Sequence, residues 1–182
     1  MTKPLLPRRL RKAVKYGPWG YRFWREAARL PYNALLKTPA VVEIEPYFPA
    51  HAELLARYET VRAEVLTHSL GKAVPANHEI MRHQKTFYDH DKIAWGMIPL
   101  RAYGLDYPKN MERFPTLGRF LKAHREVKSA TISVFPPGKH LRPHKGPFKG
   151  VWRYHLGLYV KEFEDGTTAG ELVVDGKKYY LR

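Results

Sequence analysis

At 182 residues with 44% apolar content, the chain can bury a hydrophobic core, which excludes a disordered protein. It has no cysteine, which excludes disulfide scaffolds and thiolate metal sites, so any metal must be held by nitrogen and oxygen ligands. The 32 Lys and Arg residues against 17 Asp and Glu give a net charge of +15, which favours anionic substrates, membrane surfaces or nucleic acid as partners.

Residues 1–40 form a basic aromatic arm with ten basic residues and one acidic residue. Prolines are expected to divide the arm into short pieces, of which residues 19–30 are the best helical segment. A basic amphipathic helix with Trp and Phe can lie at a lipid headgroup interface, and the alternative is an arm that packs back on its own domain. Because neither a membrane span nor a signal peptide is apparent, we expect a cytoplasmic protein that can associate peripherally with an anionic membrane.

The middle of the chain predicts helices with weaker strands between them. Apolar residues at helical spacing predict one helix over residues 50–66 and another over residues 114–124, with Pro115 in its first turn. Short strands are expected at residues 87–88 and within residues 93–100. Residues 104–110 are expected to form a loop.

The C-terminal third predicts strands. Residues 130–135 and 152–160 have β-rich patterns, and residues 170–181 predict a hairpin that turns at Asp175-Gly176. Helices followed by a run of antiparallel strands predict an α+β fold with a sandwich or barrel core.

Two of the predicted strand residues suggest an anion site. Arg153 and His155 are two positions apart and would share one sheet face. Burying both is costly without an anion, and a bound carboxylate would remove that cost through two parallel hydrogen bonds to the guanidinium. The alternative is a solvated face with a structural histidine. His144 follows a proline and is expected at a strand end or in a loop.

The region from residue 127 contains three groups of residues that form a recognisable pattern: Ser133 with Pro137-Gly138, Pro143-His144-x-Gly146-Pro147, and Arg153-x-His155-Leu156-Gly157-Leu158. With these residues the region resembles the aspartyl/asparaginyl β-hydroxylases, which are Fe(II)- and 2-oxoglutarate-dependent dioxygenases with a double-stranded β-helix, or jelly-roll, fold. The region is also similar to bacterial lipid A hydroxylases. The resemblance makes residues 41–182 the hydroxylase domain, with covering helices before the core.

The resemblance implies a role for each site residue. His144 would be the first iron ligand, and Ser133 would hydrogen-bond the distal carboxylate of 2-oxoglutarate. His155 would contact the other carboxylate of this cosubstrate near the metal. Arg153 would face the substrate pocket, beside the bound cosubstrate. There it could pair with an acidic or polar group of the substrate. The reaction would be hydroxylation of a C–H bond coupled to oxidation of 2-oxoglutarate to succinate and CO2.

Two departures from the family pattern qualify this expectation. Gly146 stands where most 2-oxoglutarate oxygenases place a carboxylate ligand; this favours the aspartyl/asparaginyl hydroxylases over the lipid A hydroxylases. The family's second iron-binding His, and the Arg that pairs with the distal carboxylate, would lie beyond Arg182. His140 is a weak substitute ligand. We therefore expect a β-core that is incomplete at the C-terminus.

Three functional readings follow. The first is a hydroxylase acting on an aspartyl or asparaginyl side chain, a small molecule or a lipid. The second is a catalytically incompetent relative that binds anions or needs a partner. The third is a binder of nucleic acid or membrane surfaces through the basic arm; nucleic acid is not favoured because no nucleic-acid-binding motif is apparent. The sequence leaves the oligomeric state open.

Overall fold

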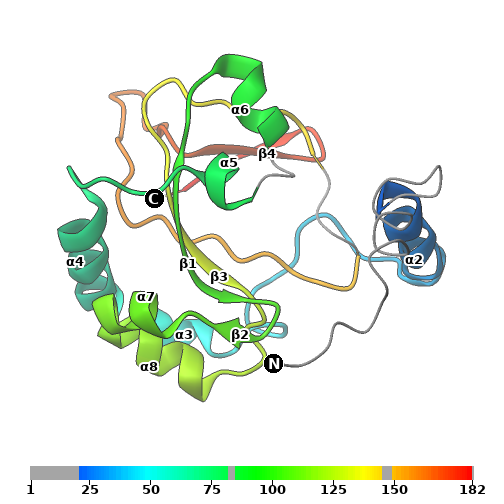
Figure 1. The fold of residues 1–182 in the computed structure, drawn as a ribbon, viewed down its shortest axis with the longest axis horizontal. Helices are drawn as coiled ribbons and strands as arrows, with labels where there is room; N and C mark the ends of the chain where they lie inside the picture. The colour runs from blue at the N-terminus through cyan, green and yellow to red at the C-terminus, as the bar shows by residue number, and fades with distance from the viewer. Residues whose placement is uncertain (1–20, 82–84, 145–148, 182) are drawn as a thin grey trace, which may run out of the picture. The chain divides into compact units, whose positions relative to one another are not determined.

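The computed structural model describes residues 21–81, 85–144 and 149–181 of the chain (Figure 1). Contacts divide the protein into two compact units. The first unit comprises residues 1–40 and 144–155, and the second comprises residues 41–143 and 156–182.

A three-stranded antiparallel sheet lies at the centre of the second unit (Figure 1). Its strands are β1 (Gly96–Ala102), β2 (Leu105–Asp106) and β3 (Ala130–Val134), in the order β2-β1-β3. The middle strand β1 is buried from Met97 to Arg101, as expected for a strand covered on both faces. Its pairing with β3 shifts register between Pro99 and Arg101, where proline cannot donate a ladder hydrogen bond.

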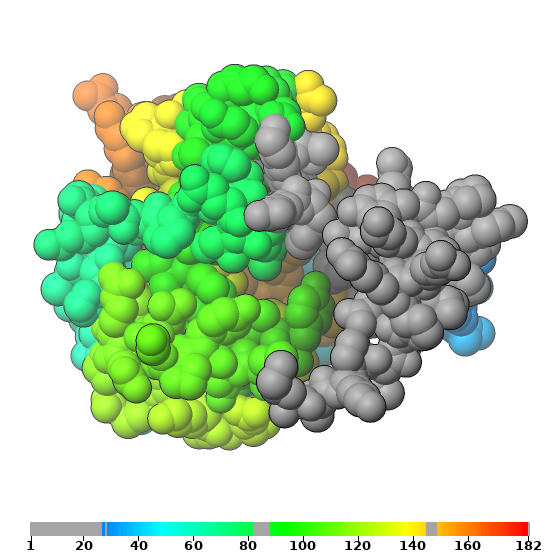
Figure 2. Space-filling model, in the orientation of Figure 1, coloured from blue at the N-terminus to red at the C-terminus, as the bar shows by residue number. Residues whose placement is uncertain are grey.

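The helices of the second unit, which are separate from the sheet in sequence, include α3 (His51–Leu55), α4 (Tyr58–Ser69), α7 (Pro108–Arg113) and α8 (Pro115–Ala123). Helix α4 packs on α8, and α7 packs on both α8 and β1, so these helices adjoin one another on the face in Figure 2. Phe114, between α7 and α8, and Val61 of α4 are fully buried, and Leu100 and Leu121 are almost so. His124, just after α8, contacts Glu53 of α3 at 2.9 Å and Glu126 at 3.1 Å, and these carboxylates raise the pKa of His124.

Two predicted helices have different outcomes. The helix expected over residues 114–124 is confirmed as α8, with Pro115 at its first position, where a missing N–H costs nothing. The single helix expected over residues 50–66 is wrong, because α3 and α4 are separated at Ala56 and Arg57. The Arg57 N–H bonds to the Leu54 carbonyl only three residues back, and this tighter turn ends α3.

The region between these helices also differs from expectation. Residues 87–88 lie in helix α6 (Lys85–Asp91), not in a strand, and Tyr88 stacks on His78 of α5 (Asn77–Ile80) at 4.1 Å. The strand expected within residues 93–100 is confirmed in part as β1. The loop expected over residues 104–110 is wrong, because it contains β2 and the start of α7, which begins at Pro108.

Both strand predictions at the ends of the C-terminal region are confirmed. Strand β3 matches residues 130–135, and β4 (Glu171–Val174) pairs with β5 (Lys177–Tyr180) as the predicted hairpin. Asp175 and Gly176 both have positive φ, at 49° and 77°, as a two-residue type I′ turn requires. The described residues form no further named strand, and the double-stranded β-helix stays a prediction.

Candidate functional site

Ser133 lies on β3, opposite Met97 of β1. Side chains alternate along a strand, so Ile132 is buried in the core whereas Ser133 is exposed on the other face. The hydroxyl is therefore presented at the surface of the second unit, where a ligand could reach it.

The loop after β3 is held down by a buried lysine. The Lys139 ammonium contacts the Asp91 carboxylate at 2.8 Å and has no exposed side-chain surface. It also lies over the Trp95 ring, which stacks on Phe135 at 5.6 Å. The hydrogen bond from Lys139 lowers the pKa of Asp91 to about 2, so this carboxylate stays ionised and keeps the ammonium paired. These contacts fix the chain soon after Ser133. Nothing in the sequence pattern pointed to them.

His144, Arg153 and His155 all belong to the first unit, whereas Ser133 belongs to the second. Ser133, His144 and Arg153 are exposed, and His155 keeps part of its surface in solvent although neighbouring atoms surround much of its ring. Gly146 and Pro147, which belong to the motif around His144, lie outside the described residues. The structure therefore brings Arg153 and His155 together with His144 in one unit and gives Ser133 its own surroundings in the other.

The strand expected over residues 152–160 is wrong. Residues 151–157 have no secondary-structure assignment, and the boundary between the two units falls after His155. Carbonyl groups just beyond this boundary bond to side chains of α4 instead of a neighbouring strand. The Tyr58 hydroxyl donates to the Gly157 carbonyl at 2.9 Å, and Arg62 Nε donates to the Leu158 carbonyl at 2.9 Å. Side-chain donors thus replace the ladder bonds of a strand.

Arg153 and His155 nevertheless interact electrostatically. Burial of the imidazole by surrounding atoms lowers the pKa of His155, and the Arg153 guanidinium lowers it further. His155 is therefore neutral at pH 7, and Arg153 supplies the positive charge of the pair. A neutral imidazole beside a guanidinium can hydrogen-bond a carboxylate that the arginine holds.

The His155 pKa should lie below its ordinary value of 6.5 in an NMR titration of the ring protons. Arg153→Leu should restore only part of the shift, because burial is the larger cause. Folding favours the neutral ring, so His155 should reduce stability as the pH falls below 6.5 and have no such effect at higher pH. Urea-unfolded protein serves as the reference. A folded-state pKa at or above the unfolded value would contradict this description of the site.

Metal ligands are sparse in the described part of the chain. Among its residues, no group of three or more His, Asp or Glu side chains could hold a metal ion. Among the described residues, His144 is the one that the family resemblance assigns as an iron ligand. Facial-triad sites need three converging ligands, so the described residues do not fit Fe(II) on their own.

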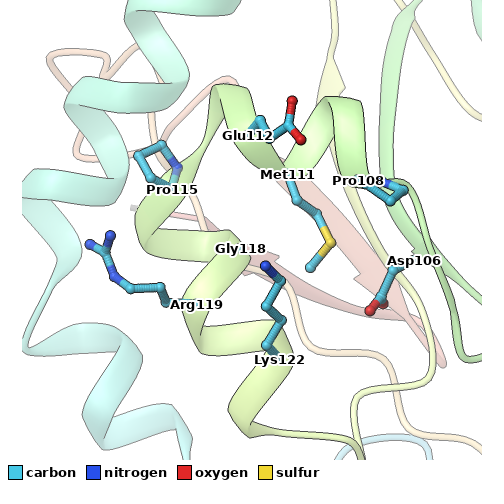
Figure 3. Close-up of a pocket in the computed structure, with 8 residues that line it drawn as sticks. All are labelled: Asp106, Pro108, Met111, Glu112, Pro115, Gly118, Arg119 and Lys122. Carbon is cyan, nitrogen blue, oxygen red and sulfur yellow. The ribbon is translucent and has the colours of Figure 1, made fainter.

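A pocket of about 460 Å³ lies elsewhere in the second unit, against α7 and α8. Figure 3 shows Met111, Lys122 and Asp106 approaching one another at this pocket, while Arg119 extends away from them. Asp106 is already paired with Arg101 and Arg125. None of the predicted site residues lines this pocket, so it does not bear on the hydroxylase site.

Comparison with known proteins identifies relatives of this chain. No solved structure matches it. A similar protein is the "Ornithine lipid ester-linked acyl 2-hydroxylase" of Rhizobium tropici, 33% identical over 143 residues, or 78% of this chain. The chain spans about half the length of that relative. The sequence model of the family described as aspartyl/asparaginyl β-hydroxylase matches residues 56–182, well over half of the chain. The chain therefore belongs to the aspartyl/asparaginyl β-hydroxylase family.

Proposed function

We propose that this protein takes part in hydroxylating the acyl chain of a polar membrane lipid. The observation that carries the proposal is the 33% identity, over 143 residues, to a protein named for 2-hydroxylation of an ester-linked acyl chain of ornithine lipid. The family match over residues 56–182 includes Ser133, His144, Arg153 and His155. An aspartyl or asparaginyl side chain is the second candidate substrate, and membership of the aspartyl/asparaginyl β-hydroxylase family favours it.

Fe(II) and 2-oxoglutarate are the proposed cofactor and cosubstrate, on the family resemblance. His144 would be one iron ligand, and further ligands would have to come from outside the described residues. The chain's own residues would bind and orient anionic groups.

Arg153 and His155 are the proposed anion-binding pair. Arg153 offers a charged planar fork that matches a carboxylate, and the neutral His155 offers a hydrogen bond without a second positive charge. Ser133 would add a hydroxyl donor on the family pattern. A carboxylate of 2-oxoglutarate, or the anionic group of a lipid headgroup, has the chemistry that this pair binds.

To test the proposal, the protein is mixed anaerobically with Fe(II), 2-oxoglutarate and either ornithine lipid or an aspartyl peptide. The reaction is then started by adding O2. Succinate formation together with lipid that has gained one oxygen atom would support the proposal. Oxidation of the peptide and not of the lipid would replace it with the second candidate. Absence of both products, with correctly folded protein, would exclude hydroxylase activity of this chain.

A further inference from the structure

Helix α2 (Tyr21–Leu35) presents apolar side chains to solvent. Its sequence is strongly amphipathic, and Leu30 and Leu35 are 66% and 80% exposed. Pro31 and Ala34, also exposed, lie between them around the same side of the helix. The expected division of the arm at Pro31 is wrong, because α2 continues through this proline. Trp19 and Gly20 of the predicted helix lie outside the described residues.

The end of α2 is tied to the segment that carries the anion-binding pair. Lys149 Nζ donates to the carbonyls of Asn33 and Leu36 at 3.0 and 3.3 Å. These carbonyls lie at the helix C-terminus, where they lack helical partners and where positive charge is favourable. Val151 and Trp152 follow directly, each with 42% of its surface exposed. The first unit thus exposes large apolar side chains from two segments.

Positive charge is concentrated in the same unit. Residues 1–40 carry ten basic residues and one acidic residue, and residues 144–155 add Lys145, Lys149 and Arg153 without an acidic residue. Twelve of the chain's fifteen net positive charges therefore belong to under a third of its length. The second unit, with more than twice as many residues, has only the remaining three.

We propose that α2 lies in the headgroup region of a bilayer that contains anionic lipids, with Leu30 and Leu35 inserted among the acyl chains. Basic residues favour the anionic headgroups, and the exposed leucines gain from leaving water. The positive charge of the first unit alone would also favour binding to nucleic acid. Exposed leucines, however, neither stack on bases nor contact phosphate, so the combination favours a membrane.

The consequence for the site is direct. Arg153 and His155 belong to the same unit as α2, so docking would hold the proposed anion-binding pair at the membrane surface. There it could meet a lipid headgroup without extracting the lipid from the bilayer. This last step rests on the proposed function, whereas the docking does not. No described helix is long and apolar enough to cross the bilayer, and the proposed contact is interfacial.

The absence of cysteine allows a clean measurement of insertion. Leu35→Cys carrying an environment-sensitive fluorophore should shift its emission to the blue on vesicles of phosphatidylcholine and phosphatidylglycerol, and much less on phosphatidylcholine alone. Leu105→Cys is the matched control, because Leu105 is 74% exposed on β2 of the second unit. Equal shifts at both positions, or none at position 35, would overturn the proposal.

Vesicle cosedimentation of leucine variants tests the same contact without a label. Leu30→Glu with Leu35→Glu should weaken binding to anionic vesicles at least about tenfold, whereas Leu105→Glu should not. Thermal melting checks that each variant folds. Vesicle binding that survives the double substitution, or binding to duplex DNA with none to vesicles, would overturn the proposal. Because no turnover is needed, failure of the hydroxylase assay leaves this result interpretable.

Discussion

Replacing Arg101 with methionine is expected to lower the free energy of unfolding by about 3 to 5 kcal/mol. The Arg101 side chain is fully buried in β1. Its Nε donates to the Asp106 carboxylate, and its Nη1 donates to the carbonyls of His124 and Val127 at 3.0 and 3.1 Å. Methionine fills similar space and donates nothing, so the two carbonyls lose this donor and Asp106 keeps only its exposed partner Arg125. Urea unfolding monitored by circular dichroism measures the difference.

Two further variants separate the charge of Arg101 from its shape. Arg101→Lys keeps the charge and loses the planar fork, so it should fall between wild type and Arg101→Met. Arg125→Met should have a much smaller effect, because Arg125 reaches the same Asp106 from an exposed position. Hydrogen bonds, chiefly from Arg101, lower the pKa of Asp106, so this carboxylate stabilises the fold above its unfolded pKa and less as acid protonates it. Equal stability of Arg101→Met and Arg125→Met would contradict this account.

Local sequence signals predicted those elements whose structure depends on neighbours in the chain. The β4–β5 hairpin follows from Asp175-Gly176, because few residue pairs accept positive φ at both turn positions. Helix α8 follows from Pro115 at its start and an apolar face that α4 covers. The sheet turn at Tyr103 and Gly104 uses the same backbone geometry, with φ of 50° and 83°. Tyr103 gave no turn signal, so residues 104–110 were expected to be a loop.

Elements that depend on distant residues could not be predicted in this way. Residues 152–160 have a strand-like pattern, and their structure depends on Tyr58 and Arg62, more than 90 positions earlier in the chain. A segment with alternating apolar and polar residues forms a strand only where a neighbouring strand is available to pair with it. The candidate site has the same limitation. The identities of His144, Arg153 and His155 are visible in the sequence, but the division that places Ser133 in the other unit is not.

His144→Ala should abolish iron-dependent turnover, if the protein is the hydroxylase proposed above. Fe(II) affinity depends on several converging ligands, so removing this imidazole from a site whose other ligands would come from outside the described residues should leave no measurable Fe(II) binding. His140→Ala is the matched control: it removes an exposed histidine four positions away, and the proposal gives it no role. Isothermal titration of Fe(II) under nitrogen, followed by succinate detection, compares the two variants. Loss of iron binding in His140→Ala and not in His144→Ala would reassign the ligand.

Arg153→Leu should behave differently from His144→Ala. It removes the charge that holds the anion, so Fe(II) binding should be unchanged while the KM for the anionic substrate or cosubstrate rises about tenfold to a hundredfold. The His155 ring reports on the same event. A bound carboxylate should raise the lowered pKa of His155 in wild type, and this response to 2-oxoglutarate should be lost in Arg153→Leu. An unchanged KM together with an unchanged His155 response would show that the anion binds elsewhere, and the pair would then be a structural feature of the first unit.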